Sequence, residues 1–176
     1  MNIEEKVRSI IRDIPNFPKE GIIFKDITPI LEDPAVTREI TAALLDPFEG
    51  QKVDAVLGIE SRGFFWGLLM AQYLQVPFIP VRKEGKLPYK TIKHSYDLEY
   101  GSAVIEVHED AIKEGSNVLI HDDLLATGGT AAAAAKLVEQ RNAKVIGFSF
   151  LVILNFLNGK SVLRSLSDQI HTIVEY

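Results

Sequence analysis

One stretch of the chain, residues 117–140, places a short apolar run, two acids, a turn of small residues and a block of alanines in direct succession. The run NVLIH is continuously apolar, which is typical of a strand buried on both faces of a parallel sheet. Alanine has the best intrinsic helix propensity, so we expect a helix over Thr130–Gln140. The stretch therefore predicts a strand, a turn at its carboxyl end and a helix, which is the repeating unit of an α/β fold.

Similar elements are spread along the rest of the chain. Further strands are expected at Val53–Ile59, Val76–Val81, Ala103–Val107, Lys144–Leu154 and Gln169–Val174, and further helices at 3–13, 34–45 and Gly63–Leu74. The pair Asp33-Pro34 is predicted to cap and open the second of these helices. Residues 83–97 lack a clear period and contain glycine, proline and many charges, so we expect a mobile loop there. The order of elements predicts one α/β domain over residues 1–176, with a mostly parallel central sheet flanked by helices.

Composition limits the classes of function. The chain has no cysteine, which excludes a disulfide scaffold, a thiolate metal site and a cysteine nucleophile. The charged N-terminal residues leave no signal-peptide core, and no apolar run reaches the ~18 residues of a membrane span. A net charge of −5 argues against non-specific nucleic-acid binding. We therefore expect a cytoplasmic protein that engages neither a membrane nor a nucleic acid.

Basic residues nevertheless cluster in one short segment. This island consists of Arg82, Lys83, Lys86, Lys90 and Lys93, with Glu84 among them. Such a cluster is either a solvated loop or a site for an anionic ligand, and the residues alone leave both readings open.

The turn that follows the two acids is predicted to bind a phosphate monoester. The first backbone N–H groups of a helix have no intrahelical partner, and the helix dipole adds positive charge at the same end. Glycines remove side chains, so that a phosphate can approach the backbone closely. The predicted phosphate-binding residues are Ala126, Thr127, Gly128, Gly129 and Thr130.

Asp122 and Asp123 are poor phosphate ligands themselves, because like charges repel. They are predicted to face sugar hydroxyls or a divalent cation, and a ribose 5-phosphate satisfies both halves of the element. The plainer interpretation is a helix cap beside two exposed acids, which the ordered sequence of acids, turn and alanine-rich helix disfavours. No lysine follows the glycines, so the element is not a Walker P-loop, and it is not a GxGxxG turn either.

The segment HDDLLATGGTA, residues 121–131, resembles the phosphoribosyl-diphosphate (PRPP) motif of type I phosphoribosyltransferases. Four more blocks resemble the adenine-using branch of that family and occur in the family's order: DIPNFPKEGIIFKDITP (13–29), GIESRGFFWG (58–67), RKEGKLP (82–88) and LEYG (98–101). The resemblance implies transfer of the 5-phosphoribosyl group of PRPP to adenine, giving AMP and pyrophosphate. It also implies Mg²⁺ held mainly by the substrate, a homodimer, and a small hood over the base formed by residues 1–33.

The resemblance implies roles for individual residues as well. The departing pyrophosphate is expected to contact Ser61, Arg62, Arg82 and Lys86. Adenine is expected to contact Phe24 and Leu154 with its two faces, and the backbone of Ile23 and Lys25 with its edge. Glu99 is expected to handle the proton of adenine, with Arg62 and Lys86 as the other catalytic residues, and Tyr100 to lie in a closing lid. The Glu60-Ser61 peptide is expected to be cis.

Some positions depart from the family pattern. These are Lys25, Tyr89, His121 and Ile153, of which His121 is interpreted as a hydrogen-bonded core histidine rather than a pH-sensitive neighbour of the acids. Two rival functions stay open. One is a phosphoribosyltransferase for another base, and the other is a regulator that binds PRPP without turnover, although the chain has no spare length for a DNA-binding module.

Overall fold

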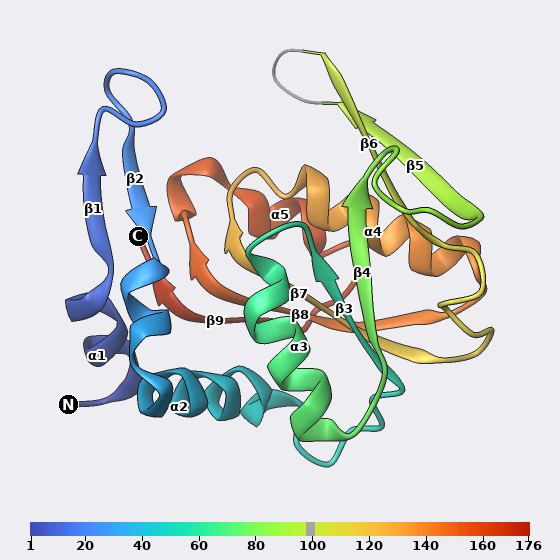
Figure 1. Cartoon of the computed structure of the whole chain (residues 1–176), viewed down its shortest axis with the longest axis horizontal. Coiled ribbons are helices and arrows are strands. Elements are labelled where there is room, and N and C mark those ends of the chain that lie inside the picture. The colour runs from blue at the N-terminus through green and yellow to red at the C-terminus, as the bar shows by residue number, and fades with distance from the viewer. Residues whose placement is uncertain (98–100) are drawn as a thin grey trace.

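The computed structural model describes residues 1–97 and 101–176 as an α/β fold (Figure 1). Its helices are α1 Ile3–Ile10, α2 Pro34–Leu45, α3 Gly63–Leu74, α4 Gly129–Gln140 and α5 Gly159–Leu163, with short 3-10 turns at Thr28–Glu32, Asp46–Phe48 and Asn155–Leu157. Its strands are β1 Arg12–Pro15, β2 Ile23–Asp26, β3 Ala55–Ile59, β4 Phe78–Lys83, β5 Thr91–Asp97, β6 Ser102–His108, β7 Asn117–Leu125, β8 Lys144–Ile153 and β9 Ile170–Glu175.

Within the described residues the central sheet has seven strands in the order β5-β6-β4-β3-β7-β8-β9. The five strands from β4 to β9 in this order run parallel, whereas β6 is antiparallel to β4 and β5 is antiparallel to β6. The predicted mostly parallel sheet is confirmed. The carboxyl ends of the parallel strands share one edge, which is where ligands of such sheets bind.

Two hydrophobic cores cover the two faces of the sheet. One core packs α1, α2 and α3 against the sheet, with Ile40, Trp66 and Met70 fully buried. The other packs α4 and α5 against the opposite face, with Ala134 and Leu163 fully buried. Figure 1 shows α2 and α3 in front of the sheet, and it shows the β1–β2 and β5–β6 hairpins extending from opposite sides of the body.

The helices with strong local signals begin and end where the sequence predicts. Asp33 caps α2 by accepting hydrogen bonds from the backbone N–H groups of Ala35 and Val36, and Pro34 is the first helical residue. The helix α3 spans Gly63–Leu74 as predicted, and α4 begins one residue earlier than predicted, at Gly129.

Three expectations about secondary structure are wrong in part. The first helix ends at Ile10, because the backbone becomes extended at Ile11 and the residues that follow pair with β2 as strand β1. The expected loop over 83–97 contains β5, whose alternating exposure follows a strand period hidden by its charges. The strand expected to end at His121 continues through the acids to Leu125, because β8 pairs with it along this length.

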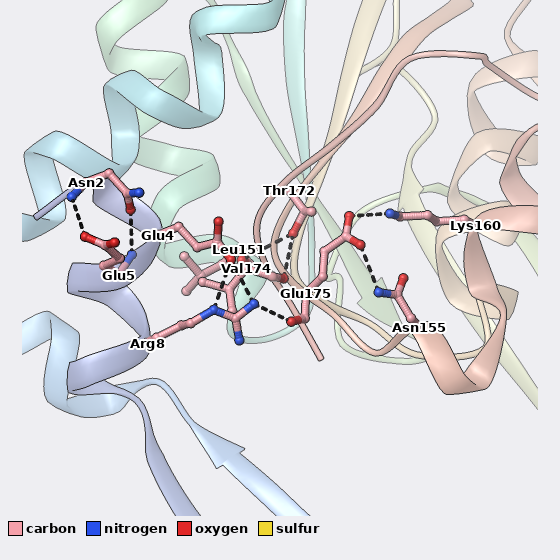
Figure 2. A network of polar contacts seen from close by, with 10 residues as sticks. All are labelled: Asn2, Glu4, Glu5, Arg8, Leu151, Asn155, Lys160, Thr172, Val174 and Glu175. Carbon is pink, nitrogen blue, oxygen red and sulfur yellow. Dashed lines mark hydrogen bonds and ion pairs between the residues drawn. The ribbon is translucent and has the colours of Figure 1, made fainter.

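The first helix is tied to the last strand by polar contacts (Figure 2). Asn2 and Glu5 form a capping box at the start of α1. Arg8 donates to the backbone carbonyl of Glu175 at 2.5 Å, and the Glu175 carboxylate accepts from Asn155 at 2.8 Å and from the Lys160 ammonium. These contacts fix the base of the β1–β2 hairpin against the body of the protein.

Candidate active site

The predicted phosphate turn lies between the end of β7 and the start of α4. It lines a hollow of about 80 Å³ whose walls include residues 124–131 and Asp122. Gly128 has φ of +88°, a conformation that favours glycine, and an added Cβ would lie 2.8 Å from the carbonyl oxygen of Gly159. The structure therefore brings Ala126–Thr130 together at a helix N-terminus, as the sequence predicts.

Thr130, in the first turn of α4, is in contact with the β5–β6 hairpin. Its hydroxyl donates to the hydroxyl of Tyr96 at 3.0 Å. An added Cβ on Gly129 would lie 3.4 Å from the Tyr96 ring, which is ordinary contact distance. Tyr96 is a neighbour of the phosphate turn that the sequence did not indicate, because it lies in a segment expected to be a loop.

The two acids lie in the last part of β7 rather than after it. Asp123 is 5% exposed and Asp122 is half-buried, and Asp122 accepts a hydrogen bond from the backbone N–H of Asp123 at 2.8 Å. Burial, and then the negative charge of Asp123, raise the pKa of Asp122 well above its usual value. Burial also raises the pKa of Asp123, although the Arg62 guanidinium opposes this shift. The charged forms of both carboxyl groups are therefore disfavoured, and a cation or sugar hydroxyls beside them would stabilise those charged forms.

Arg62 connects the acid pair to the predicted base site. Its Nε lies 3.0 Å from Asp123 Oδ2, and its guanidinium carbon lies 4.9 Å from the centre of the Phe24 ring. It directly precedes α3, and the Glu60-Ser61 peptide before it is cis, as expected. One side chain thus joins three segments that are distant in the sequence.

A larger hollow, of about 300 Å³, lies beside this contact. Its lining combines the predicted Ser61, Arg62, Asp122 and Asp123 with Glu60, Lys83 and Leu124. Cationic and backbone donors of this kind suit the oxygens of a pyrophosphate. The start of α3 packs closely on the acids, because an added Cβ on Gly63 would lie 2.8 Å from Asp122 Oδ1. The sequence indicated Gly63 only as part of the resembling block.

Arg82 and Lys86 do not contribute to the described lining of that hollow. Arg82 Nε lies 3.1 Å from the Glu60 carboxylate, which also accepts the backbone N–H of Lys83 at 3.0 Å. Lys86 is exposed on the turn after β4, and its carbonyl oxygen lies 3.4 Å from Arg82 Nη1. The predicted pyrophosphate residues therefore form two groups, one around Arg62 and one on this turn.

The predicted base residues lie in and near the β1–β2 hairpin. Phe24 is half-buried between Arg62 and Phe17, whose ring centre is 5.1 Å from that of Phe24 in an edge-on arrangement. The Lys25 ammonium lies 2.7 Å from Asp13 Oδ1 and 3.8 Å from the centre of the Tyr176 ring.

Ile23, on the same strand as Phe24, is 57% exposed. Leu154, just after β8, is half-buried and donates its N–H to Leu125. The contacts that these residues make with a base stay predictions, as do those of Glu99 and Tyr100, which lie outside the described residues.

His121 is a core residue, but the expectation that it is hydrogen-bonded is wrong. It is fully buried, and within the described residues neither ring nitrogen has a hydrogen-bond partner. Burial lowers its pKa to about 3, and the backbone of Ser149 on the neighbouring strand, which does not meet hydrogen-bond geometry with the ring, opposes this shift. The imidazole is therefore neutral at physiological pH.

The mostly parallel sheet, with the predicted phosphate turn at its carboxyl edge, indicates a phosphoribosyltransferase, and comparison with known proteins agrees with this class. A family model described as the phosphoribosyl transferase domain matches residues 26–169. An adenine phosphoribosyltransferase from Flavobacterium johnsoniae is 53% identical over 90% of the chain and 94% of that protein. One from Nitrosococcus oceani is 51% identical over 98% of the chain and 99% of that protein.

Solved structures agree with these relatives. The adenine phosphoribosyltransferase of Rhodothermus marinus superimposes with a TM-score of 0.94 at 48% identity, covering 99% of this chain and 98% of that one. The enzyme of Saccharomyces cerevisiae, solved with adenine and an imino-altritol bisphosphate, superimposes with a TM-score of 0.90 at 42% identity, covering 97% and 98%. The chain belongs to the adenine phosphoribosyltransferase family.

Proposed function

We propose that the protein transfers the 5-phosphoribosyl group of PRPP to adenine and releases AMP and pyrophosphate, as a step of purine salvage. The observation that carries this is the position of Arg62, between the buried carboxylate of Asp123 and the ring of Phe24. This contact places a flat aromatic surface for a base next to an edge of the sheet built for a sugar phosphate. The names of the relatives supply the base, adenine.

In this proposal the protein acts mainly by positioning charged groups. The amides at the start of α4 and the hydroxyls of Thr127 and Thr130 hold the 5′-phosphate, and Asp122 and Asp123 hold the ribose hydroxyls. Because Arg62 already contacts Asp123, arrival of the sugar lets its guanidinium turn toward the pyrophosphate oxygens. Arginine offers several donors in one plane, which suits this task.

The described residues contain no group of three or more acids or histidines arranged to hold a metal ion. The half-buried Asp122 and the buried Asp123 offer carboxylate oxygens, which are hard donors of the kind that Mg²⁺ takes alongside water and substrate phosphates. Asp122 and Asp123 would hold such an ion only through the ribose or water. When bound, Mg²⁺ supplies charge neutralisation for the pyrophosphate that leaves.

The base is proposed to bind at the open edge of β2, under a hood formed by residues 1–33. In the described residues β2 pairs with β1 alone, so part of its backbone is free to read the edge of adenine through Ile23 and Lys25. Phe24 stacks on one face of the purine, a contact worth ~1–3 kcal/mol, and Leu154 covers the other. Glu99 is proposed to handle the adenine proton and Tyr100 to belong to a closing lid, and both residues lie outside the described part of the chain.

A homodimer is proposed from an exposed apolar stripe on α3. Its members recur at helical spacing and are 38–66% exposed: Phe65, Leu68, Leu69 and Tyr73. Such a surface on one face of a helix suits a second copy of the chain. Light scattering after size exclusion should show a dimer that Leu68→Lys weakens.

In the described residues no helix is long and apolar enough to cross a bilayer. The proposed location is the cytoplasm.

The deciding experiment mixes the protein with PRPP, Mg²⁺ and adenine and measures AMP and pyrophosphate. Guanine, hypoxanthine and orotate replace adenine in parallel reactions. We expect adenine to be strongly preferred, and omission of Mg²⁺ to stop the reaction. Preference for another base would reassign the substrate, and PRPP binding without turnover of any base would make the protein a regulator.

A further inference from the structure

Glu106, in the middle of β6, is a buried carboxylate that the proposed reaction does not use. It is 2% exposed. Its cross-strand neighbours are Arg82 on β4 and Lys93 on β5, so the two cationic side chains flank it on the same face of the sheet. A carboxylate is rarely buried without partners, because desolvation disfavours its charged form.

The partners of Glu106 lie in the turn between β4 and β5 and in the first residues of β5. Its Oε1 accepts the backbone N–H groups of Lys86 and Leu87, each at 3.1 Å, and its Oε2 accepts the Thr91 hydroxyl at 3.0 Å. The Lys93 ammonium lies 4.0 Å from Oε2. Burial raises the pKa of Glu106, but these hydrogen bonds outweigh it and hold the pKa below its usual value. The carboxylate is therefore charged, with one oxygen bound to the turn and the other to β5.

Other contacts of the turn lie at its start, where the Glu84 carboxylate accepts from the Lys93 ammonium at 2.8 Å and the Glu84 N–H donates to the Val104 carbonyl at 3.0 Å. Lys86 is exposed, and Gly85 has φ of +79° with open space around it. At the near end, Glu60 binds Arg82 and the backbone N–H of Lys83. Two carboxylates therefore hold this segment. Glu60 binds its start at Arg82 and Lys83, and Glu106 binds the backbone of Lys86 and Leu87. Holding a loop in its binding conformation improves affinity by reducing the entropy lost on binding.

We propose that Glu106 is a positioning residue for anion binding, which fixes the turn so that Arg82 and Lys86 are preset for the pyrophosphate group. The inference rests on the proposed role of these two cations. Glu106 contacts neither substrate nor reacting atoms. It acts through the backbone, which is why an acidic residue supports a site for an anion.

The test compares Glu106→Ala, Glu106→Asp and Glu106→Gln by calorimetric titration with magnesium pyrophosphate and by steady-state kinetics. Alanine removes both acceptors: the Leu87 amide loses that partner, and the Lys86 amide keeps only its longer contact with the Lys83 carbonyl at 3.3 Å, so we expect pyrophosphate affinity to fall about tenfold or more. Aspartate keeps the negative charge, but its side chain is one methylene shorter and its oxygens no longer reach the two amides. We therefore expect Glu106→Asp to fold readily and to lose a similar amount of pyrophosphate affinity. Glutamine keeps an acceptor for the two amides and should recover most of the affinity.

A positioning role predicts a particular split among the kinetic constants. KM for PRPP should rise with pyrophosphate Kd, whereas kcat at saturating PRPP and KM for adenine should stay within about threefold of wild type. Thr91→Val removes the third partner without touching the amides, so it is the matched control and should have little effect. In a double-mutant cycle with Lys86→Ala, the losses should be strongly non-additive, because Glu106 acts through that residue.

Each outcome decides the matter. Wild-type pyrophosphate affinity in folded Glu106→Ala or Glu106→Asp, or equal losses in all constants, overturns the inference. If Lys86→Ala weakens pyrophosphate binding and the Glu106 variants do not, the inference fails while the proposed function stands. If the wild-type protein binds no pyrophosphate, both fail.

Discussion

Replacing His121 by valine should stabilise the protein, and increasingly so as the pH falls. The imidazole is fully buried in β7, and within the described part of the chain neither nitrogen is hydrogen-bonded. One nitrogen of a neutral imidazole always carries a proton, so a donor and an acceptor are both left without partners. Valine has a high strand propensity and a similar size, and it removes both groups.

The size of the effect follows from two contributions. At pH 7 an unsatisfied buried polar group destabilises a protein by about 1–3 kcal/mol, and valine removes this cost. Valine also leaves a small cavity, which offsets part of the benefit, so we expect the free energy of unfolding to rise by about 1 kcal/mol. The pKa falls from 6.5 to about 3 on folding. Between these values the unfolded chain binds a proton that the folded protein does not, so wild-type stability is lost as the pH drops below 6.5. Over the 1.5 units to pH 5 this adds about 2 kcal/mol.

Urea unfolding of both proteins at pH 7 and pH 5 measures the two contributions. Other titrating groups, including Asp122 and Asp123, are common to both proteins, so the difference between the curves isolates His121. His171→Val is the contrasting control, because His171 Nε2 lies 3.0 Å from the carbonyl oxygen of Ala43 and its loss should destabilise the fold at pH 7. A His121→Val protein that is no more stable than wild type, with a difference that does not change between the two pH values, would refute the reasoning.

Three further predictions concern the site and the fold. Gly128→Ala should weaken ribose 5-phosphate binding more than Gly129→Ala, because φ of +88° strains alanine and its Cβ would meet a carbonyl oxygen at 2.8 Å; equal losses by titration would contradict this. Asp123→Asn should raise KM for PRPP at least about tenfold, since a charge-assisted contact to Arg62 and a sugar ligand are both weakened, with a smaller change in KM for adenine. Asn2→Ala should lower the unfolding free energy by about 1 kcal/mol through loss of the capping box and leave both KM values unchanged.

Local signals in the sequence were enough to predict much of the fold. Asp33 and Pro34 mark the start of α2 through hydrogen bonds within three residues, and the alanines of α4 need no distant partner. The β1–β2 hairpin and β5 were missed for the opposite reason. A strand is stabilised by the strand beside it, and the alternation in β5 is concealed because Lys93 and His94 are both polar.

The site was predictable where one motif contains it and unpredictable where the fold assembles it. The turn at Ala126–Thr130 forms as expected because its residues are consecutive. The contact of Arg62 with Phe24 and the support of Arg82 by Glu60 depend on how the sheet and the hairpin pack, which no local spacing encodes. The lack of a hydrogen-bond partner for His121 could not be predicted either, because the sequence does not show which groups surround a buried side chain in the fold.

The hydroxyl contact between Thr130 and Tyr96 joins the phosphate turn to the β5–β6 hairpin. A hydroxyl donates and accepts at the same time, so Thr130 can give its hydrogen to a phosphate oxygen while Tyr96 donates to Thr130 Oγ1. The contact between the two side chains would then survive phosphate binding with its direction reversed. A single oxygen atom would connect the ligand to the antiparallel edge of the sheet, without any change in the helix itself.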